Sequence, residues 1–361
     1  MDLVPLIDLV GEPATLLIGG AVLGLLFGFA AQRSAFCTRS AVLDITRGRG
    51  LDSLAVWLAG LATAILGIQW LLLSGMIGVS DTRFFSTAQS LSGALVGGLL
   101  FGVGMILARG CVSRLLVLGA SGNLRAVFSI FVIAVVGVAT YSGALVPLRN
   151  AIGGMASTAA IGGNDLLAHF ALGREAGVVI GAVLAVVALV LAIRARASWW
   201  RVAGGIAVGA SVVGGWYFTH ELSAQVFEPI QTESLSFIRP LATTSEIALG
   251  DWSFGLDQGL LIGTVGGAFL AAILFGQFRV ATFSEPDTPS VLRYATGSAL
   301  MGFGGILAVG CTIGAGFTGG SVLAVSSLLG LASMIAGAAL ADRVIDRSRV
   351  PSPAGLSVPA E

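Results

Sequence analysis

The sequence has few charged residues and no lysine, and this scarcity limits the kind of protein it can be. Charged residues make up 11% of the 361 positions, and all 19 basic residues are arginine. Soluble domains contain roughly a quarter charged residues, so this chain could not cover a water-exposed surface with polar groups. Hydrophobic residues reach 56%, which predicts a membrane protein.

Histidine and cysteine are too few for the common metal and disulfide frameworks. The histidines are His169 and His220, and the cysteines are Cys37, Cys111 and Cys311. An odd number of cysteines excludes a complete disulfide framework, and Cys-x-x-Cys and Cys/His zinc spacings are absent. We therefore expect no metal site and no cofactor. The sequence also has no phosphate-binding motif of the GxxxxGK[ST] type, which would indicate ATP-driven work.

Apolar runs of about 20 residues, the length that crosses a bilayer as a helix, recur along the chain. Backbone polar groups have no water partner in lipid, so spans are helices or closed barrels, and these continuous runs lack the alternation of barrel strands. The prediction is an all-α polytopic membrane protein. Its nine expected spans are residues 14–32, 51–75, 90–108, 123–146, 175–195, 200–220, 255–276, 291–309 and 319–341.

The arginines are distributed unevenly between the predicted loops. With the N-terminus outside, 15 of the 19 arginines fall in cytoplasmic segments and 4 in outer segments. Because cytoplasmic loops are enriched in basic residues, we predict a multi-pass protein of the bacterial inner membrane. Its N-terminus would be outside and its C-terminus cytoplasmic. Most acidic residues fall in outer segments on this map, so the outer face is expected to be acidic.

Three segments resemble one another and each ends in a cysteine: residues 24–37, 98–111 and 298–311. The numbering offset from Cys111 to Cys311, applied to Cys37, leads to Phe237, where the cysteine is missing. Similarity of Gly/Leu/Ala-rich membrane helices in general is the alternative explanation. We interpret the pattern as an internal repeat with four elements, of which the one at Phe237 is the weakest.

The repeat divides the chain into two halves. The first half is residues 1–146 with spans one to four, and the second is residues 197–341 with spans six to nine. Residues 147–196 hold the connecting fifth span, and residues 342–361 are expected to be a disordered cytoplasmic tail. A single intervening span makes equivalent spans run in opposite directions, and inverted repeats with broken helices are typical of transporters.

Short segments follow each repeat element, at residues 38–48, 112–122 and 312–322, and cannot cross the bilayer. They suit re-entrant helices, which are tolerated at membrane depth only where protein or a cavity surrounds them. With the Phe237 element, we predict four such short helices that enter from opposite sides. They would meet near the centre and form an hourglass-like path.

The chemistry at these positions suits a soft anion. A thiol is a weak, polarizable donor that stays neutral in apolar surroundings, and glycine-rich helix starts offer backbone N–H groups. A packing role is the alternative for each cysteine. The predicted substrate-binding residues are Cys37, Cys111, Cys311, Gly110, Gly310 and Thr312. Candidates for attracting anions, or simply for fixing topology, are Arg39, Arg109, Arg114 and Arg239.

The segments FCTRSAV (36–42), ARGCVSRLLVLGASGN (108–123) and GCTIGAGFTGGSVLAVSSLLG (310–330) resemble the YeeE/YedE family. Characterised members of that family take up thiosulfate across the bacterial inner membrane. The resemblance implies nine transmembrane helices with short central ones. It also implies that Cys37, Cys111 and Cys311 contact the anion in succession, and on the predicted topology the inward order would be Cys311, Cys111, Cys37. A TusA-like cytoplasmic sulfur carrier is an implied partner, and selenium or other sulfur species are alternative substrates.

Two other classes of function stay open. A membrane thiol enzyme would use Cys37 and Cys111 to carry or exchange persulfide sulfur, and it would need a low-pKa thiol beside a base or a cation. A structural subunit would use the cysteines only for packing. The sequence favours a non-enzymatic permease, because no histidine lies near the cysteines. It does not distinguish channel-like passage from coupled transport.

Overall fold

The computed structural model describes residues 3–48, 50–226, 230–247, 254–285 and 288–346, and every regular element named within these ranges is helical. Nine helical stretches in this part of the chain are long and apolar enough to cross a membrane, which confirms the predicted number of spans. The long helices are α2 (Glu12–Ser34), α4 (Asp52–Leu73), α5 (Leu91–Leu107), α7 (Leu124–Tyr141), α10 (Arg174–Arg194), α11 (Trp199–Ser223), α13 (Leu256–Leu274), α14 (Val291–Leu307) and α15 (Val325–Ala341).

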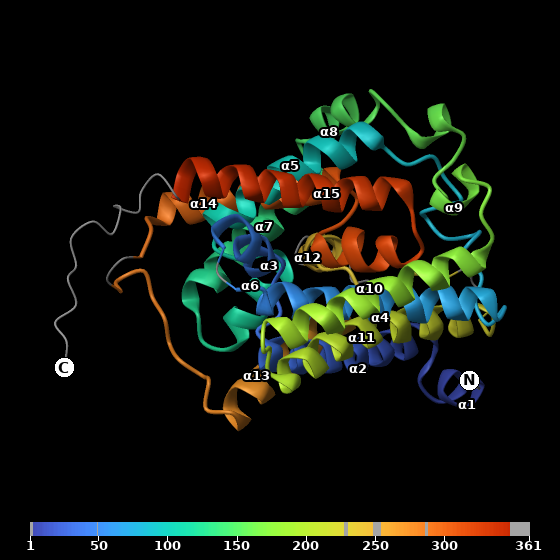
Figure 1. Cartoon of the computed structure of the whole chain (residues 1–361), viewed down its shortest axis with the longest axis horizontal. Helices are drawn as coiled ribbons and strands as arrows, with labels where there is room; N and C mark the ends of the chain where they lie inside the picture. Colours follow the sequence, from blue (N-terminus) through green and yellow to red (C-terminus); the bar gives the residue numbers. More distant parts are fainter. Residues whose placement is uncertain (1–2, 49, 227–229, 248–253, 286–287, 347–361) are drawn as a thin grey trace.

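Four short helices occupy the positions predicted for re-entrant elements. They are α3 (Thr38–Arg47), α6 (Val112–Ala120), α12 (Ile238–Ile247) and the π-helical η2 (Thr312–Gly319). Helices α3 and α12 begin and end at positions related by the same offset that relates Cys111 to Cys311, so the segment after Phe237 matches the segment after Cys37. Figure 1 shows α3, α6 and α12 between α14 and α15 above and α2, α4, α10 and α11 below.

Five further short elements were not predicted. They are α1 (Val4–Val10), α8 (Val146–Gly153), η1 (Thr158–Ile161), α9 (Leu166–His169) and η3 (Asp342–Asp346). Three of them, α8, η1 and α9, lie in the segment 147–196 or at its start, ahead of the fifth span. The expected disordered tail begins with η3, whose Asp342 is buried, and residues 347–361 lie outside the described residues.

Two span boundaries differ clearly from the prediction. The fourth span ends at Tyr141 instead of residue 146, and Pro147, which suits a first helical turn, lies at the start of α8 instead of extending α7. The ninth span begins at Val325 instead of residue 319. Asn164, from a distant loop, accepts the N–H of Val325 on its carbonyl and that of Ser326 on its side chain, each at 2.8 Å.

Glycines let the long helices approach closely. A Cβ added to Gly24 of α2 would clash with the backbone carbonyl of Leu260, and one added to Gly263 of α13 would clash with that of Ala21. Without a hydrophobic drive between helices in lipid, such close van der Waals packing is a main source of association. The α2–α13 pair is therefore built on mutual backbone contact.

The packing of the two halves is reciprocal. Gly97 of α5 faces Gly304 of α14, and Gly104 of α5 faces Gly297 of α14. The offset of the sequence repeat converts the first contact into the second. Helix α5 also packs on α15, and α14 packs on α7. Because the repeat offset relates α5 to α14 and α7 to α15, these two contacts are equivalent.

We predict that Gly263→Ala destabilises the protein, whereas Gly266→Ala in the same helix does not. The first methyl group would overlap the backbone of α2, and overpacking costs about 1–3 kcal/mol; the second meets nothing within 4 Å. Thermal unfolding of the purified variants in one detergent measures the difference. Equal midpoints for the two variants would contradict this account of the packing.

Candidate functional site

The three cysteines are buried free thiols, and each stands immediately before a short helix. Cys37 precedes α3, Cys111 precedes α6 and Cys311 precedes η2. Phe237 holds the equivalent place before α12 and is also buried. The structure thus gives one local geometry to the cysteine positions that the sequence repeat had aligned.

The backbone turns in the same way before each cysteine. Ala35, Arg109 and Val309, two positions ahead of the thiols, have φ values of 54°, 61° and 56°. Residues other than glycine rarely adopt this left-handed conformation, which costs of the order of 1–3 kcal/mol and is often retained at functional sites. The repeated strain shows that the sharp break before each short helix is a specific feature of the fold.

Gly110 and Gly310 lie in these turns. The N–H of Gly110 donates to the carbonyl of Met105 at 3.1 Å, and that of Gly310 donates to the carbonyl of Gly305 at 2.9 Å. A Cβ at Gly310 would also come within 2.6 Å of the backbone nitrogen of Ala315. Both predicted glycines therefore close the turn with their own N–H groups, and the free N–H groups belong to the helix starts that follow.

No side chain makes a capping hydrogen bond of normal geometry at the starts of α3, α6 or η2, and N–H groups there face the weakly accepting thiols. The convergence is greatest at Cys311, whose sulfur is approached by four backbone N–H groups. Two come from Phe237 and Ile238 at the start of α12, and two come from Ile313 and Gly314 in η2. Helix starts carry roughly half a positive charge, so two of them favour negative charge at this point.

Two buried hydroxyls near Cys311 have no hydrogen-bond partner among the described residues. They belong to Thr312, a predicted substrate-binding residue, and to Ser236. Ser236 lies next to η2, since a Cβ at Gly314 would come within 2.6 Å of its Oγ. Buried polar groups are normally paired, so these hydroxyls are available to a polar ligand.

Cys37 and Cys111 lie together. Their side chains interact with each other, and Arg114 lies near both thiols. The sulfur of Cys111 is also 3.4 Å from the hydroxyl of Ser113. Residues that are far apart in the sequence thus form one site with two thiols and a guanidinium.

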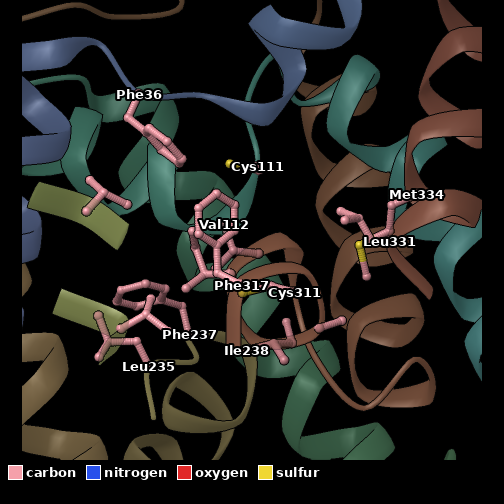
Figure 2. Packing of buried hydrophobic residues seen from close by; sticks show 14 of the residues in the cluster. Phe36, Cys111, Val112, Leu235, Phe237, Ile238, Cys311, Phe317, Leu331 and Met334 are labelled. Atoms are coloured by element: carbon pink, nitrogen blue, oxygen red, sulfur yellow. The ribbon is translucent and has the colours of Figure 1, made fainter. Parts of the chain in front are cut away.

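Apolar side chains separate this pair from Cys311. In Figure 2, Val112 and Phe317 lie between the labelled sulfur atoms of Cys111 and Cys311. The Phe317 ring packs edge-on against Phe36 and against Trp57, with ring centroids 5.5 Å apart in both cases. The Cys311 position is therefore separated from Cys111 by packed apolar side chains.

One cavity, of about 270 Å³, lies beside α12 and is called the Arg239 cavity here. Arg239 forms ion pairs with Glu233 and, at 2.8 Å, with Asp257. Two carboxylates beside one guanidinium leave no net positive charge. Arg239 was predicted to attract the anion, and it does line a cavity. However, Glu233 and Asp257 neutralise its charge.

A second cavity, of about 600 Å³, is called the basic cavity. Its lining includes five arginines: Arg33, Arg114, Arg125, Arg201 and Arg279. None of the three cysteines lines either cavity, but Arg114 lines the basic cavity and lies near the Cys37–Cys111 pair.

The other two predicted arginines lie elsewhere. Arg39 is near Cys37 and is 3.8 Å from Asp346, within an ion-pair cluster completed by Arg47, Asp342 and Arg293. Arg109 is exposed and contributes to the left-handed turn. Of the four predicted arginines, the structure thus brings Arg114 and Arg39 to the thiols, and Arg239 to a cavity on its own.

Arg83 was missed as a candidate because it appeared only as one arginine of an outer loop. Its guanidinium stacks on Phe84 at 4.8 Å from the ring centroid, and its Nε has no hydrogen-bond partner among the described residues. Burial lowers the pKa of Arg83 below its ordinary value, and the nearby Glu233 opposes this shift without cancelling it. Arginine nevertheless stays protonated. Cys311 is close enough to interact with its charge. The aromatic residues after Arg83 were the available signal for burial.

Nine membrane-length helices in the described part of the chain, together with broken helices that start at its centre, are typical of multi-pass membrane transporters. The chain is a member of the sulphur-transport family, also called YeeE/YedE, whose sequence pattern matches residues 33–340. It is 29% identical to the thiosulfate transporter TsuA of Spirochaeta thermophila over 325 residues, which are 85% of this chain and 92% of the relative. It is 22% identical to the thiosulfate transporter TsuA of Escherichia coli over 354 residues, 90% and 93% of the two chains.

We predict that Arg239→Gln lowers stability, because Glu233 and Asp257 would lose their counter-charge in a largely buried site. Removing one partner of a buried ion pair lowers the free energy of unfolding by about 3–5 kcal/mol. These three side chains are partly exposed, so we expect a loss near the lower end of that range. The triple variant with Glu233→Gln and Asp257→Asn should recover part of the loss. Thermal unfolding in detergent tests this, with Arg194→Gln at an exposed position as control; a triple variant less stable than Arg239→Gln would refute it.

Proposed function

We propose that this protein takes up thiosulfate, or a closely related small sulfur anion, across the bacterial inner membrane. Two relatives that match it over most of their length are named thiosulfate transporters, and the family is one of sulphur transport. The observation that carries the proposal is the placement of three buried thiols at three uncapped helix starts. Such starts attract anions, and thiols suit the terminal sulfur of thiosulfate.

Cys311 would be the first thiol reached by an anion from outside. Four backbone N–H groups approach its sulfur, and the unpaired hydroxyls of Thr312 and Ser236 are close by. These groups are neutral donors that can replace water around the anion, while the charge of Arg83 acts as the anion approaches. Binding would therefore be weak enough for the anion to leave again, as passage requires.

Cys111 and Cys37 would receive the anion next. Because the aromatic cluster of Phe36, Trp57 and Phe317 separates them from Cys311, transfer requires these rings to move. The anion would then arrive beside Arg114, which has an unpaired, buried guanidinium nitrogen among the described residues. Release on the cytoplasmic side would supply a TusA-like sulfur carrier.

The orientation with the N-terminus outside and the C-terminus cytoplasmic belongs to the same proposal. It places the Arg239 cavity outside and the basic cavity in the cytoplasm, as the enrichment of arginine in cytoplasmic segments indicates. The division into halves at residues 1–146 and 197–341 is supported by the reciprocal contacts of α5 with α14. An inverted repeat would explain why short helices from the two halves converge on the buried centre.

One observation favours a second candidate, a membrane thiol enzyme that transfers persulfide sulfur. The contact between Cys37 and Cys111 lies beside Arg114 and Arg39, and nearby cations lower thiol pKa values and raise reactivity. Labelling of the two thiols as a function of pH separates the candidates. A reactive thiolate near neutral pH would favour the enzyme, and slow labelling that needs alkaline pH would favour the permease.

We expect Cys37→Ala, Cys111→Ala and Cys311→Ala each to reduce thiosulfate uptake about tenfold or more, the scale of one lost hydrogen bond to a charged group. Uptake into proteoliposomes by equal amounts of protein is the measurement. Ser74→Ala, at an exposed site at the end of α4, should behave as wild type. Full activity in all three cysteine variants would reduce the thiols to packing residues and remove this mechanism.

Arg83→Gln should raise the KM for thiosulfate about tenfold with a smaller effect on the maximal rate, because Arg83 would act when the anion approaches Cys311. Arg149→Gln, an arginine bonded at the surface to Tyr141 and Asn150, is the control. A KM that is unchanged in Arg83→Gln would exclude an entry role for this guanidinium.

A further inference from the structure

The basic cavity collects arginines from distant parts of the chain. Arg33 is on α2, Arg114 on α6 and Arg201 on α11, while Arg125 lies in the first turn of α7 and Arg279 follows α13. These elements meet only in the folded protein. A cavity of about 600 Å³ has ample room for an anion of the size of sulfate together with water.

Carboxylates neutralise only part of this charge. Glu285 pairs with Arg125 at 3.1 Å and with Arg279 at 3.6 Å, and Asp52 pairs with Arg201. Five arginines thus face two carboxylates, which leaves an excess of three positive charges among the described residues. The guanidinium of Arg33 lies over the ring of Phe275, 4.5 Å from its centroid; this ring does not neutralise its charge.

Arg114 is the member that most needs a ligand. Its Nη1 is fully buried and has no hydrogen-bond partner among the described residues. An unpaired buried charge is strongly unfavourable, and buried polar groups are almost always satisfied. The guanidinium of Arg114 therefore lacks an acceptor, and this side chain lines the cavity and lies near the thiols of Cys37 and Cys111.

Polar side chains complete the lining. Ser121, Asn123 and Ser198 line the same cavity, as do Gln32 and Gln277, where Gln32 donates to Gln277 at 2.9 Å. Guanidinium groups offer paired N–H donors that match the oxygens of a tetrahedral oxoanion. The hydroxyl of Ser198 and the side-chain amide of Asn123 can add neutral hydrogen bonds, whereas the hydroxyl of Ser121 donates to the carbonyl of Val117 at 2.8 Å. The cavity thus has the composition of an oxoanion site and not merely of a charged loop surface.

We propose that the basic cavity is a binding site for a small divalent oxoanion, with Arg114 at its base and Arg33 at its side. The site accepts thiosulfate after the thiols and also accepts sulfate, which lacks the terminal sulfur that the thiols recognise. Its place on the path rests on the proposed function, but its affinity for sulfate does not. A lipid phosphate has similar chemistry; the proximity of Arg114 to the two thiols favours a soluble anion.

Calorimetric titration of the purified full-length protein in detergent with sodium sulfate tests the site, with sodium chloride at equal ionic strength as the blank. Wild type should bind sulfate, and thiosulfate should compete. Arg114→Gln and Arg33→Gln should each raise the Kd about tenfold or more. Arg194→Gln, exposed at the end of α10, should leave the Kd unchanged. If Arg114→Gln does not fold, the Kd of Arg33→Gln alone still tests the site.

The source of the anion is tested in nanodiscs. Sulfate binding that is equal in phosphatidylcholine and in phosphatidylglycerol supports a soluble ligand. Binding that is lost in phosphatidylglycerol but regained in phosphatidylcholine would assign the cavity to a lipid headgroup and overturn the proposal.

The site and the transport function fail in different ways. Active thiosulfate uptake by a protein that binds no sulfate would overturn the site and leave the proposed function standing. Sulfate binding with the predicted arginine dependence, in a protein that takes up no thiosulfate, would support the site and overturn the function.

Discussion

The structure depends on close contact between helix backbones in a setting where lipid provides no hydrophobic drive for helices to associate. The α2–α13 and α5–α14 pairs approach at glycines, so that each helix lies against the backbone of its partner. These tight pairs hold the ends of α2, α5 and α14 in fixed positions. This packing therefore sets where the long helices break. It also sets where the short helices begin, at Cys37, Cys111 and Cys311.

Broken helices raise a second requirement, because their first N–H groups need acceptors. At α7 and α15 asparagine supplies them: Asn123 caps its own helix, and Asn164 reaches α15 from a distant loop. At the three cysteine positions no side chain does so. The same fold thus distinguishes helix starts that are complete from helix starts that remain able to bind an anion.

Much of the architecture could be predicted from the sequence because it rests on local patterns. Apolar runs indicated the nine spans, and the constant offset between repeat elements indicated the short helix after Phe237. The start of α15 could not be predicted, since Asn164 defines it from a loop that is remote in the sequence. Likewise, the cysteines were recognised as equivalent, but the proximity of Cys37 to Cys111 arises only from tertiary packing. Arg83 is half-buried against Phe84, and in the sequence only the aromatic residues that follow it indicated this. Arg239 looked like a free cation because Glu233 and Asp257 are separate from it in sequence.

The neutralisation of Arg239 has a consequence for the rate at which solute is captured. A mouth with excess positive charge attracts anions over a Debye length, about 8 Å at physiological ionic strength, and loses that advantage as salt increases. The Arg239 cavity sets two carboxylates against its guanidinium, so it has no excess positive charge with which to attract an anion. If this cavity is the outer entrance, salt should not slow the capture of the anion there, because there is no attraction for salt to screen.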